Sequence, residues 1–210
     1  CRDDRVSPIN NDVSSSHASL IENKVKDLSY TYNIVPSSIA IIDSLILENE
    51  NTVIAGQIHS QKSKLTHSFL IMLDKSGNLI WEKILNFNNI KVPEKIYELP
   101  NGELLLIGYY TKIEGHKYAQ VTSDIWLQKF SLEGAKIWDQ TIGSKAYSED
   151  ALLAKPIGDT SILIVGVQNR TGKNLYCASV NSKGVTEWEH HEKIGLLNTN
   201  IEVTIKNDDI

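Results

Sequence analysis

Short apolar runs that alternate with polar turn residues dominate the pattern of this sequence. Three of these runs end in a glycine, at Gly56, Gly108 and Gly166. After each glycine comes a polar stretch and then a second apolar run that carries one aromatic residue. These aromatic residues are Phe69, Trp126 and Tyr176. Because short apolar runs bounded by glycine and polar clusters are typical of buried strands, the pattern predicts an all-β fold.

A second column of residues recurs at a constant distance from these aromatics. Eight residues after each of them, a glycine begins a Gly-x-x-x-Trp motif, which ends in Trp81, Trp138 and Trp188. Columns that recur together in three units indicate an internal repeat. Burying a large aromatic side chain removes roughly 150–250 Å² from water, so we expect both aromatic columns to pack between neighbouring units rather than to bind a ligand.

Each unit is predicted to contain four antiparallel strands. In the second unit we expect strands at residues 95–99, 103–110, 124–130 and 135–142. Turns at residues 100–102 and 131–134 and a polar loop at residues 111–123 would join them, with Gly134 at positive φ. Four-stranded antiparallel units of about 40–50 residues are typical of β-propeller blades, whose faces need neighbouring blades to bury them.

We therefore predict a partial β-propeller over residues 38–210. Its blades would lie at about residues 38–90, 91–148 and 149–197, with the first strand of a fourth blade within residues 198–210. Propellers close with four to eight blades, so we expect these residues to be an N-terminal portion of a longer propeller, or its resolved portion. Completion of a half-propeller by another chain is the alternative.

The segment ahead of the repeat, residues 19–37, is predicted to hold a short helix and a strand. Ile21, Val25 and Leu28 would line one side of the helix. Residues 30–35 alternate like a strand, which would be the candidate to complete the last blade.

Charge and hydropathy exclude two classes of partner. Lys and Arg number 21 against 26 Asp and Glu, so the net charge of −5 leaves no basic excess for nucleic acid. The longest apolar run, residues 69–73, is far shorter than the roughly 20 residues of a membrane-spanning helix.

The Gly-x-x-x-Trp hairpin resembles repeats of the quinoprotein-like propeller group and of the lipoprotein propeller in the outer-membrane barrel-assembly machinery. A repeat of Bacteroidetes surface proteins is similar in period, with an Asp-aromatic-Leu strand like that around Trp126. The resemblance covers about residues 38–196 and implies the blade fold. It supplies no ligand set for a quinone, so we expect no cofactor.

The first residue, Cys1, is followed by a polar segment that includes Asp3 and Asp4. This start resembles that of outer-membrane lipoproteins of Bacteroidetes-type bacteria, in which the Cys is acylated and acidic residues form a surface-export signal. We therefore expect residues 1–18 to be a flexible tether and an acylated Cys1 to hold the protein at the outer membrane. The cell surface is the expected side, and the periplasmic face is the alternative. A start at Cys that has nothing to do with lipidation is the other interpretation.

Candidate catalytic and metal-binding residues are sparse. His190, His191 and Glu192 form the densest cluster, but adjacent strand residues point to opposite faces and would not share a metal. Asp74 begins an Asp-x-Ser-x-Asn pattern that we interpret as a hairpin turn rather than a calcium loop. Cys177 lies in an apolar run and is expected to be an unreactive thiol. We therefore expect no catalytic residue and no metal.

The connections between second and third strands are the expected recognition surface, because loops on a rigid scaffold commonly carry binding residues. These connections are residues 57–66, 111–123 and 168–173. The candidate contacts are Tyr109, Tyr110, His116 and Tyr118.

The sequence thus favours a non-enzymatic surface lipoprotein that binds a protein, as an accessory subunit of an outer-membrane transport, secretion or assembly complex. One alternative is a glycan- or peptide-binding lipoprotein for nutrient uptake. The other is an enzyme whose active site lies in blades absent from this sequence.

Overall fold

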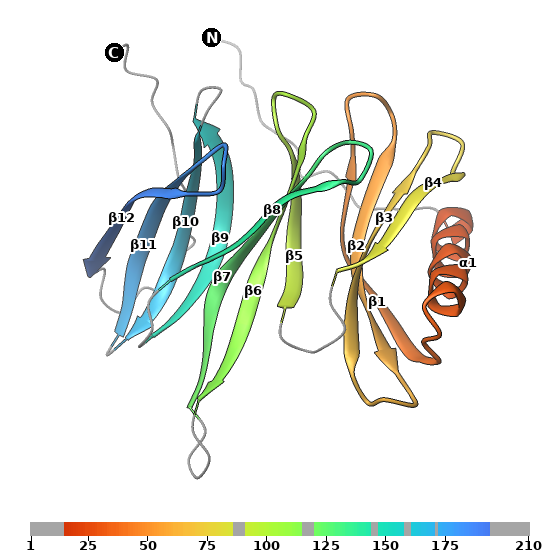
Figure 1. Cartoon of the computed structure of the whole chain (residues 1–210), viewed down its shortest axis with the longest axis horizontal. Helices are drawn as coiled ribbons and strands as arrows, with labels where there is room; N and C mark the ends of the chain where they lie inside the picture. The colour runs from red at the N-terminus through yellow and green to blue at the C-terminus, as the bar shows by residue number, and fades with distance from the viewer. Residues whose placement is uncertain are drawn as a thin grey trace. The chain divides into compact units, whose positions relative to one another are not determined.

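The computed structural model describes residues 15–85, 91–114, 120–143, 147–157, 161–170 and 172–193. Within these ranges the chain forms one helix, α1 (Ser15–Thr31), and three four-stranded sheets (Figure 1). The strand orders are β1-β2-β3-β4, β5-β6-β7-β8 and β12-β11-β10-β9, so chain neighbours pair within every sheet. The predicted all-β architecture of four-stranded antiparallel sheets is confirmed.

The three sheets follow one another along the chain. The first contains β1 (Pro36–Ile46), β2 (Thr52–Ser60), β3 (Thr66–Leu73) and β4 (Leu79–Ile84). The second contains β5 (Lys91–Glu98), β6 (Leu104–Glu114), β7 (Gln120–Phe130) and β8 (Lys136–Ile142). The third contains β9 (Ser148–Ile157), β10 (Ser161–Arg170), β11 (Gly172–Asn181) and β12 (Thr186–Lys193). The chain divides into two compact units, Cys1–Ile96 and Tyr97–Ile210, and the division falls inside β5.

A glycine lies opposite an aromatic residue across the two central strands of every sheet. The pairs are Gly56 with Phe69, Gly108 with Trp126, and Gly166 with Tyr176. A methyl group at Gly56 would overlap both the Ala40 carbonyl oxygen and the Phe69 ring. A methyl group at Gly166 would overlap the Asp150 carbonyl oxygen. Glycine is therefore needed at Gly56 and Gly166 because the first strand of the sheet comes too close for a side chain.

The hairpins between third and fourth strands share one turn geometry. Gly77, Gly134 and Gly184 have φ angles of 81°, 82° and 81°. Each of these glycines donates its backbone N–H to the carbonyl three residues earlier, at 2.9 Å. Residues that carry a side chain rarely adopt such positive φ angles. The turn therefore explains why each Gly-x-x-x-Trp motif begins with glycine.

The core of the second unit lies between the second and third sheets. Leu105 and Ile125 from β6 and β7 cluster with Ile164 and Tyr176 from β10 and β11. Trp138 from β8 belongs to the same cluster. The two sheets therefore pack face to face, which buries one aromatic residue of each repeat column.

The core of the first unit joins the first sheet to α1. Val25 and Leu28, both fully buried, cluster with Ile54, Phe69 and Ile71 of the sheet. Ile21 packs at the edge of this cluster. The predicted apolar side of the helix is thus the side that meets the sheet, because residues three or four apart share one face of a helix.

The strand predicted at residues 30–35 is wrong. Helix α1 continues through Thr31, and the backbone N–H of Ile34 donates to the Ser29 carbonyl at 2.8 Å beyond the left-handed Asn33. This pairing is the Schellman arrangement that commonly ends helices. Burial of Leu28 against the sheet favours helix here over the strand preference of the local sequence.

Candidate functional site

The loop predicted at residues 111–123 is mostly strand. β6 runs through Glu114 and β7 begins at Gln120, and their ladder continues to the pair formed by these two residues. The pairing of Thr111–Glu114 with Gln120–Ser123 extends β6 and β7, and sequence polarity alone does not separate such paired strands from a loop. Tyr109 and Tyr110 are half-buried strand residues of β6. His116 and Tyr118 lie outside the described residues.

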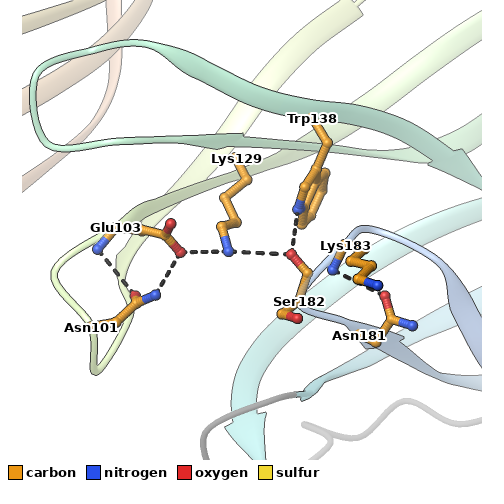
Figure 2. Close-up of polar contacts among 7 residues, drawn as sticks. All are labelled: Asn101, Glu103, Lys129, Trp138, Asn181, Ser182 and Lys183. Atoms are coloured by element: carbon orange, nitrogen blue, oxygen red, sulfur yellow. Dashed lines mark hydrogen bonds and ion pairs between the residues drawn. The ribbon is translucent and has the colours of Figure 1, made fainter.

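The clearest specific contact in the second unit joins Trp138 to the β11–β12 turn. The indole Nε1 of Trp138 donates to the Ser182 carbonyl oxygen at 2.9 Å (Figure 2). A methyl group at Gly184 would lie 2.8 Å from Cδ2 of the indole, so the turn lies directly on the ring. The motif glycine of the third sheet therefore contacts the motif tryptophan of the second.

A buried lysine strengthens the same contact. Lys129 Nζ donates to the Ser182 carbonyl oxygen at 3.3 Å and forms an ion pair with Glu103 (Figure 2). Its side chain is only 6% exposed. Asn101 Nδ2 donates to the carboxylate of Glu103 at 2.6 Å. Because a buried charge is costly without partners, these contacts explain how an amine is tolerated here. Lys129 was not predicted as a contact residue, because its only signal in the sequence is a cation within an apolar strand.

In the second and third sheets, the acidic residue that follows the motif tryptophan lies against an aromatic side chain of its own sheet. Asp139 Oδ1 accepts a hydrogen bond from Trp126 Nε1 at 2.8 Å. Glu189 lies beside the Tyr176 hydroxyl, whose pKa is raised by burial first and then by Glu189 and other carboxylates. In the first sheet the equivalent aromatic is Phe69, whose ring has no group that could donate a hydrogen bond to Glu82. Burial raises the pKa of Glu82, and a hydrogen bond from Thr31 of α1 partly lowers it again.

Carboxylates also gather beneath Gly143 in the second unit. A methyl group there would lie 2.6 Å from Glu149 Oε2 and 3.1 Å from Asp124 Oδ1. Glu149 is fully buried and accepts a hydrogen bond from Gln168 Nε2 at 2.6 Å. Across the described residues, no group of three His, Cys, Asp or Glu side chains is arranged to hold a metal ion.

The two neighbouring histidines form separate local contacts. His190 Nε2 lies 3.6 Å from Glu192 Oε2, and both side chains are exposed. His191 Nε2 lies 4.0 Å from Glu189 Oε2, and its ring centroid lies 5.2 Å from that of Tyr176.

Asp74 serves its own hairpin turn. Its Oδ1 accepts from the backbone N–H groups of Ser76 at 2.9 Å and Asn78 at 2.7 Å. Asn78 Nδ2 donates to Oδ2 at 2.9 Å. The Asn78 side chain is the main cause of a lowered Asp74 pKa. Both oxygens are therefore engaged in the turn.

The six aromatic residues of the repeat differ in burial. Phe69, Trp126 and Tyr176 are fully buried, and Trp138 is 9% exposed. Trp81 is half-buried, whereas Trp188 is 46% exposed. Cys177 is a half-buried free thiol whose pKa is raised by burial. Cys1 lies outside the described residues.

No family model and no curated protein matches this chain. Ten chains of solved structures match it. One is the cryo-EM structure of Morganella morganii TcdA4, at 11% identity and a TM-score of 0.44. The match covers 85% of this chain and 9% of the TcdA4 chain, so this chain spans a small part of that protein. In the part of the chain that the structure describes, no helix is long and apolar enough to cross a membrane.

Proposed function

We propose that this protein is a non-enzymatic lipoprotein of the outer membrane whose sheets are blades of a β-propeller. In this proposal it binds a protein, as an accessory subunit of a transport, secretion or assembly complex. The repeated glycine–aromatic pairs and glycine turns support the blade assignment, as does the face-to-face packing in the second unit. Support for the anchor comes from Cys1 and the polar segment that follows it.

Exposed aliphatic side chains beside the hairpin turns are the observation that best supports partner binding. In the first unit, Ile46 is 73% exposed at the end of β1, and Ile80 is exposed at the start of β4 near the Gly77 turn. In the second unit, Ile137 and Val185 are exposed at the corresponding end of their own sheets. Apolar groups that recur at one end of a repeat provide surface that a protein partner can bury.

Site-specific photo-crosslinking in membranes of the producing organism tests partner binding. A photoreactive residue at Ile46 or Ile137 should yield one defined crosslinked protein. The matched control is Lys62, an exposed polar position in the β2–β3 turn, which should yield none. Equal patterns at all three positions, or no crosslink at either aliphatic position, would contradict the proposal. A second photoreactive position at Tyr110 tests the hairpin surface that the sequence favoured.

Mass spectrometry of the native N-terminus tests the anchor separately. We expect Cys1 to carry acyl chains, because two or three chains at about 0.8 kcal/mol per buried methylene hold a protein stably on a bilayer. An unmodified Cys1 in protein isolated from its own organism would remove the membrane part of the proposal.

A further inference from the structure

The first strands of the three sheets, β1, β5 and β9, can be compared position by position. Ser44 of β1 and Ala154 of β9 each pair with the residue two positions before the ladder glycine of the next strand. Ser44 also lies three residues before Leu47, whose backbone N–H bonds across the following turn. Ile96 of β5 lies three residues before Leu99, which bonds across its own turn in the same way. Ser44, Ile96 and Ala154 are therefore equivalent.

At two of these positions the backbone N–H donates to a side chain of the preceding first strand. In the first unit the Ile96 N–H donates to Asp43 Oδ2 at 2.8 Å. In the second unit the Ala154 N–H donates to the Tyr97 hydroxyl at 3.2 Å. Ile96 and Ala154 are both buried. Because such an N–H points away from its own sheet, an oxygen from a neighbouring strand satisfies the donor and fixes how the two strands meet.

The equivalent N–H of Ser44 also points away from its sheet. The Leu47 N–H donates to the Asn51 carbonyl at 2.8 Å, and inward and outward N–H groups alternate along an antiparallel strand. Ser44 is exposed, and no described residue accepts a hydrogen bond from it. The first strand of the first sheet thus presents the same donor as the other two, but without the acceptor.

Two exposed isoleucines flank this donor. Ile41 and Ile46 are 45% and 73% exposed, and they lie on the same side of β1 as the Ser44 side chain. In β9 the residue equivalent to Ile41 is Ala151, which packs against the core of the second unit. The cluster under α1 includes Ile39 of β1 but neither exposed isoleucine. This part of β1 is therefore an apolar surface around one unused donor.

We propose that β1 is the docking edge for an extended segment of a partner protein, which places a carboxylate or hydroxyl oxygen on the Ser44 N–H and apolar side chains on Ile41 and Ile46. The contacts that Asp43 and Tyr97 already make within this chain are the template. Burial of the two isoleucines drives docking, and the hydrogen bond fixes the register. The inference rests on the partner binding proposed above and adds the chemistry of the partner at β1.

A second copy of this chain does not supply the acceptor through its third sheet. In β1 the acceptor is Asp43, one residue before the position of Ser44, and in β5 it is Tyr97, one residue after that position. The same two positions of β9 hold Leu153 and Lys155. Neither of these side chains accepts a hydrogen bond. The occupant that fits is therefore a protein of different sequence.

Proline at position 44 tests the donor directly. It removes the N–H and leaves the ladder with β2 intact, because this N–H faces away from the sheet. In a chain with a photoreactive residue at Ile46, Ser44→Pro should lower the yield of the crosslinked partner about tenfold. Ile41→Asp should lower it by a similar factor, because a carboxylate would then be buried against apolar groups. Mass spectrometry of the crosslinked peptide should find an acidic residue or a tyrosine of the partner beside the crosslink.

The matched control is Thr141→Pro, which changes an exposed residue of the edge strand β8. Its ladder position corresponds to Ile84, whose neighbour Leu85 donates the N–H that bonds to β3. This proline should leave the yield within about twofold of the parent. Circular dichroism checks that each variant keeps its sheets. If Ser44→Pro loses them, hydrogen exchange decides, and the Ser44 amide should exchange about tenfold more slowly in the purified complex than in the free chain.

A loss of yield in Ser44→Pro that Thr141→Pro does not share would establish the inference. Equal yields in the parent and a folded Ser44→Pro, or equal exchange rates of the Ser44 amide, would overturn it and leave partner binding intact. A defined crosslink at Ile137 with none at Ile46 would do the same. A crosslink from Ile46 to its own chain or to a second copy would also overturn the inference, because the occupant would not be a different protein.

Discussion

Trp138 and Trp188 occupy the same position of the same motif, yet their surroundings differ. Each follows a glycine turn at positive φ, and each pairs in its ladder with a residue of the preceding strand, Lys129 or Ser179. Trp138 is 9% exposed beneath the β11–β12 turn, whereas Trp188 is 46% exposed. The hairpin is thus built by its own residues, and burial of its tryptophan depends on the next sheet.

The first and the third sheet also differ in how one of their faces is covered. Helix α1 covers the face of the first sheet that carries Phe69, and no described element packs in the same way over Leu163, Cys177 and Trp188 of the third sheet. In a closed propeller, the face of the first sheet that carries Phe69 would meet the last blade. If the sheets are propeller blades, as proposed, ring closure would require the last blade to pack on α1 or to displace it.

The largest expected effect is at the covered tryptophan. Trp138→Ala should lower the free energy of unfolding of the second unit by about 3–5 kcal/mol, because it removes a buried aromatic ring from the core. Trp188→Ala should cost about 1 kcal/mol or less, because half of that ring is already in water. Urea unfolding followed by circular dichroism measures both. Equal losses would show that the two sites are covered to the same extent.

The turn that lies on Trp138 should be the next most sensitive position. Gly184→Ala combines a positive φ with a contact 2.8 Å from the indole, so we expect a loss of about 2–4 kcal/mol. Gly102→Ala has a similar φ of 77° with no atom within 4 Å of the added methyl, and should cost only about 1–2 kcal/mol. The difference between the two, measured by thermal unfolding, isolates the packing on the ring.

Lys129 should contribute less than the ring beside it. Lys129→Met leaves Glu103 without its cation, but Glu103 is 26% exposed and keeps Asn101, so we expect a loss of about 2 kcal/mol. Ser179→Ala, at the matched position of the third sheet, removes one hydrogen bond to Glu187 of 2.9 Å and should cost about 1 kcal/mol. Urea midpoints test the order. Because Ser179 is itself 2% exposed, a larger effect at Ser179 would mean that its hydrogen bond to Glu187 constrains the third sheet more than the Lys129 ion pair constrains the second.

The smallest expected effect is on the pKa of Asp74 in the β3–β4 turn. Nuclear magnetic resonance titration should give Asp74 a pKa below the ordinary value of an aspartate, and Asn78→Ala should raise that pKa, because the hydrogen bond from the Asn78 side chain is the main cause of the lowering. A lowered acid pKa stabilises the fold above the unfolded pKa, and this contribution is lost as pH falls through the folded value. The turn on Trp138 uses the neutral Asn181 in the same role, so it should show no such dependence.

Local sequence was sufficient for the sheets and their turns. The glycine–aromatic columns and the Gly-x-x-x-Trp motif predicted three four-stranded units, because strand alternation and positive φ are properties of a few adjacent residues. The same reasoning failed where tertiary contacts decide. It assigned residues 30–35 to a strand, although burial of Leu28 extends α1 to Thr31. It also assigned residues 111–123 to a loop, although their pairing extends β6 and β7.

The sequence by itself determined the three four-stranded units, the glycine turns of their hairpins and which positions carry large aromatic rings. Only the tertiary structure decided which of those rings are buried, that Lys129 is held between Glu103 and the Ser182 carbonyl, and that α1 covers the first sheet. The physical reason is that hairpin geometry is encoded within a few residues. Burial of a sheet face depends on a partner element that is distant in sequence, and no local pattern specifies that partner.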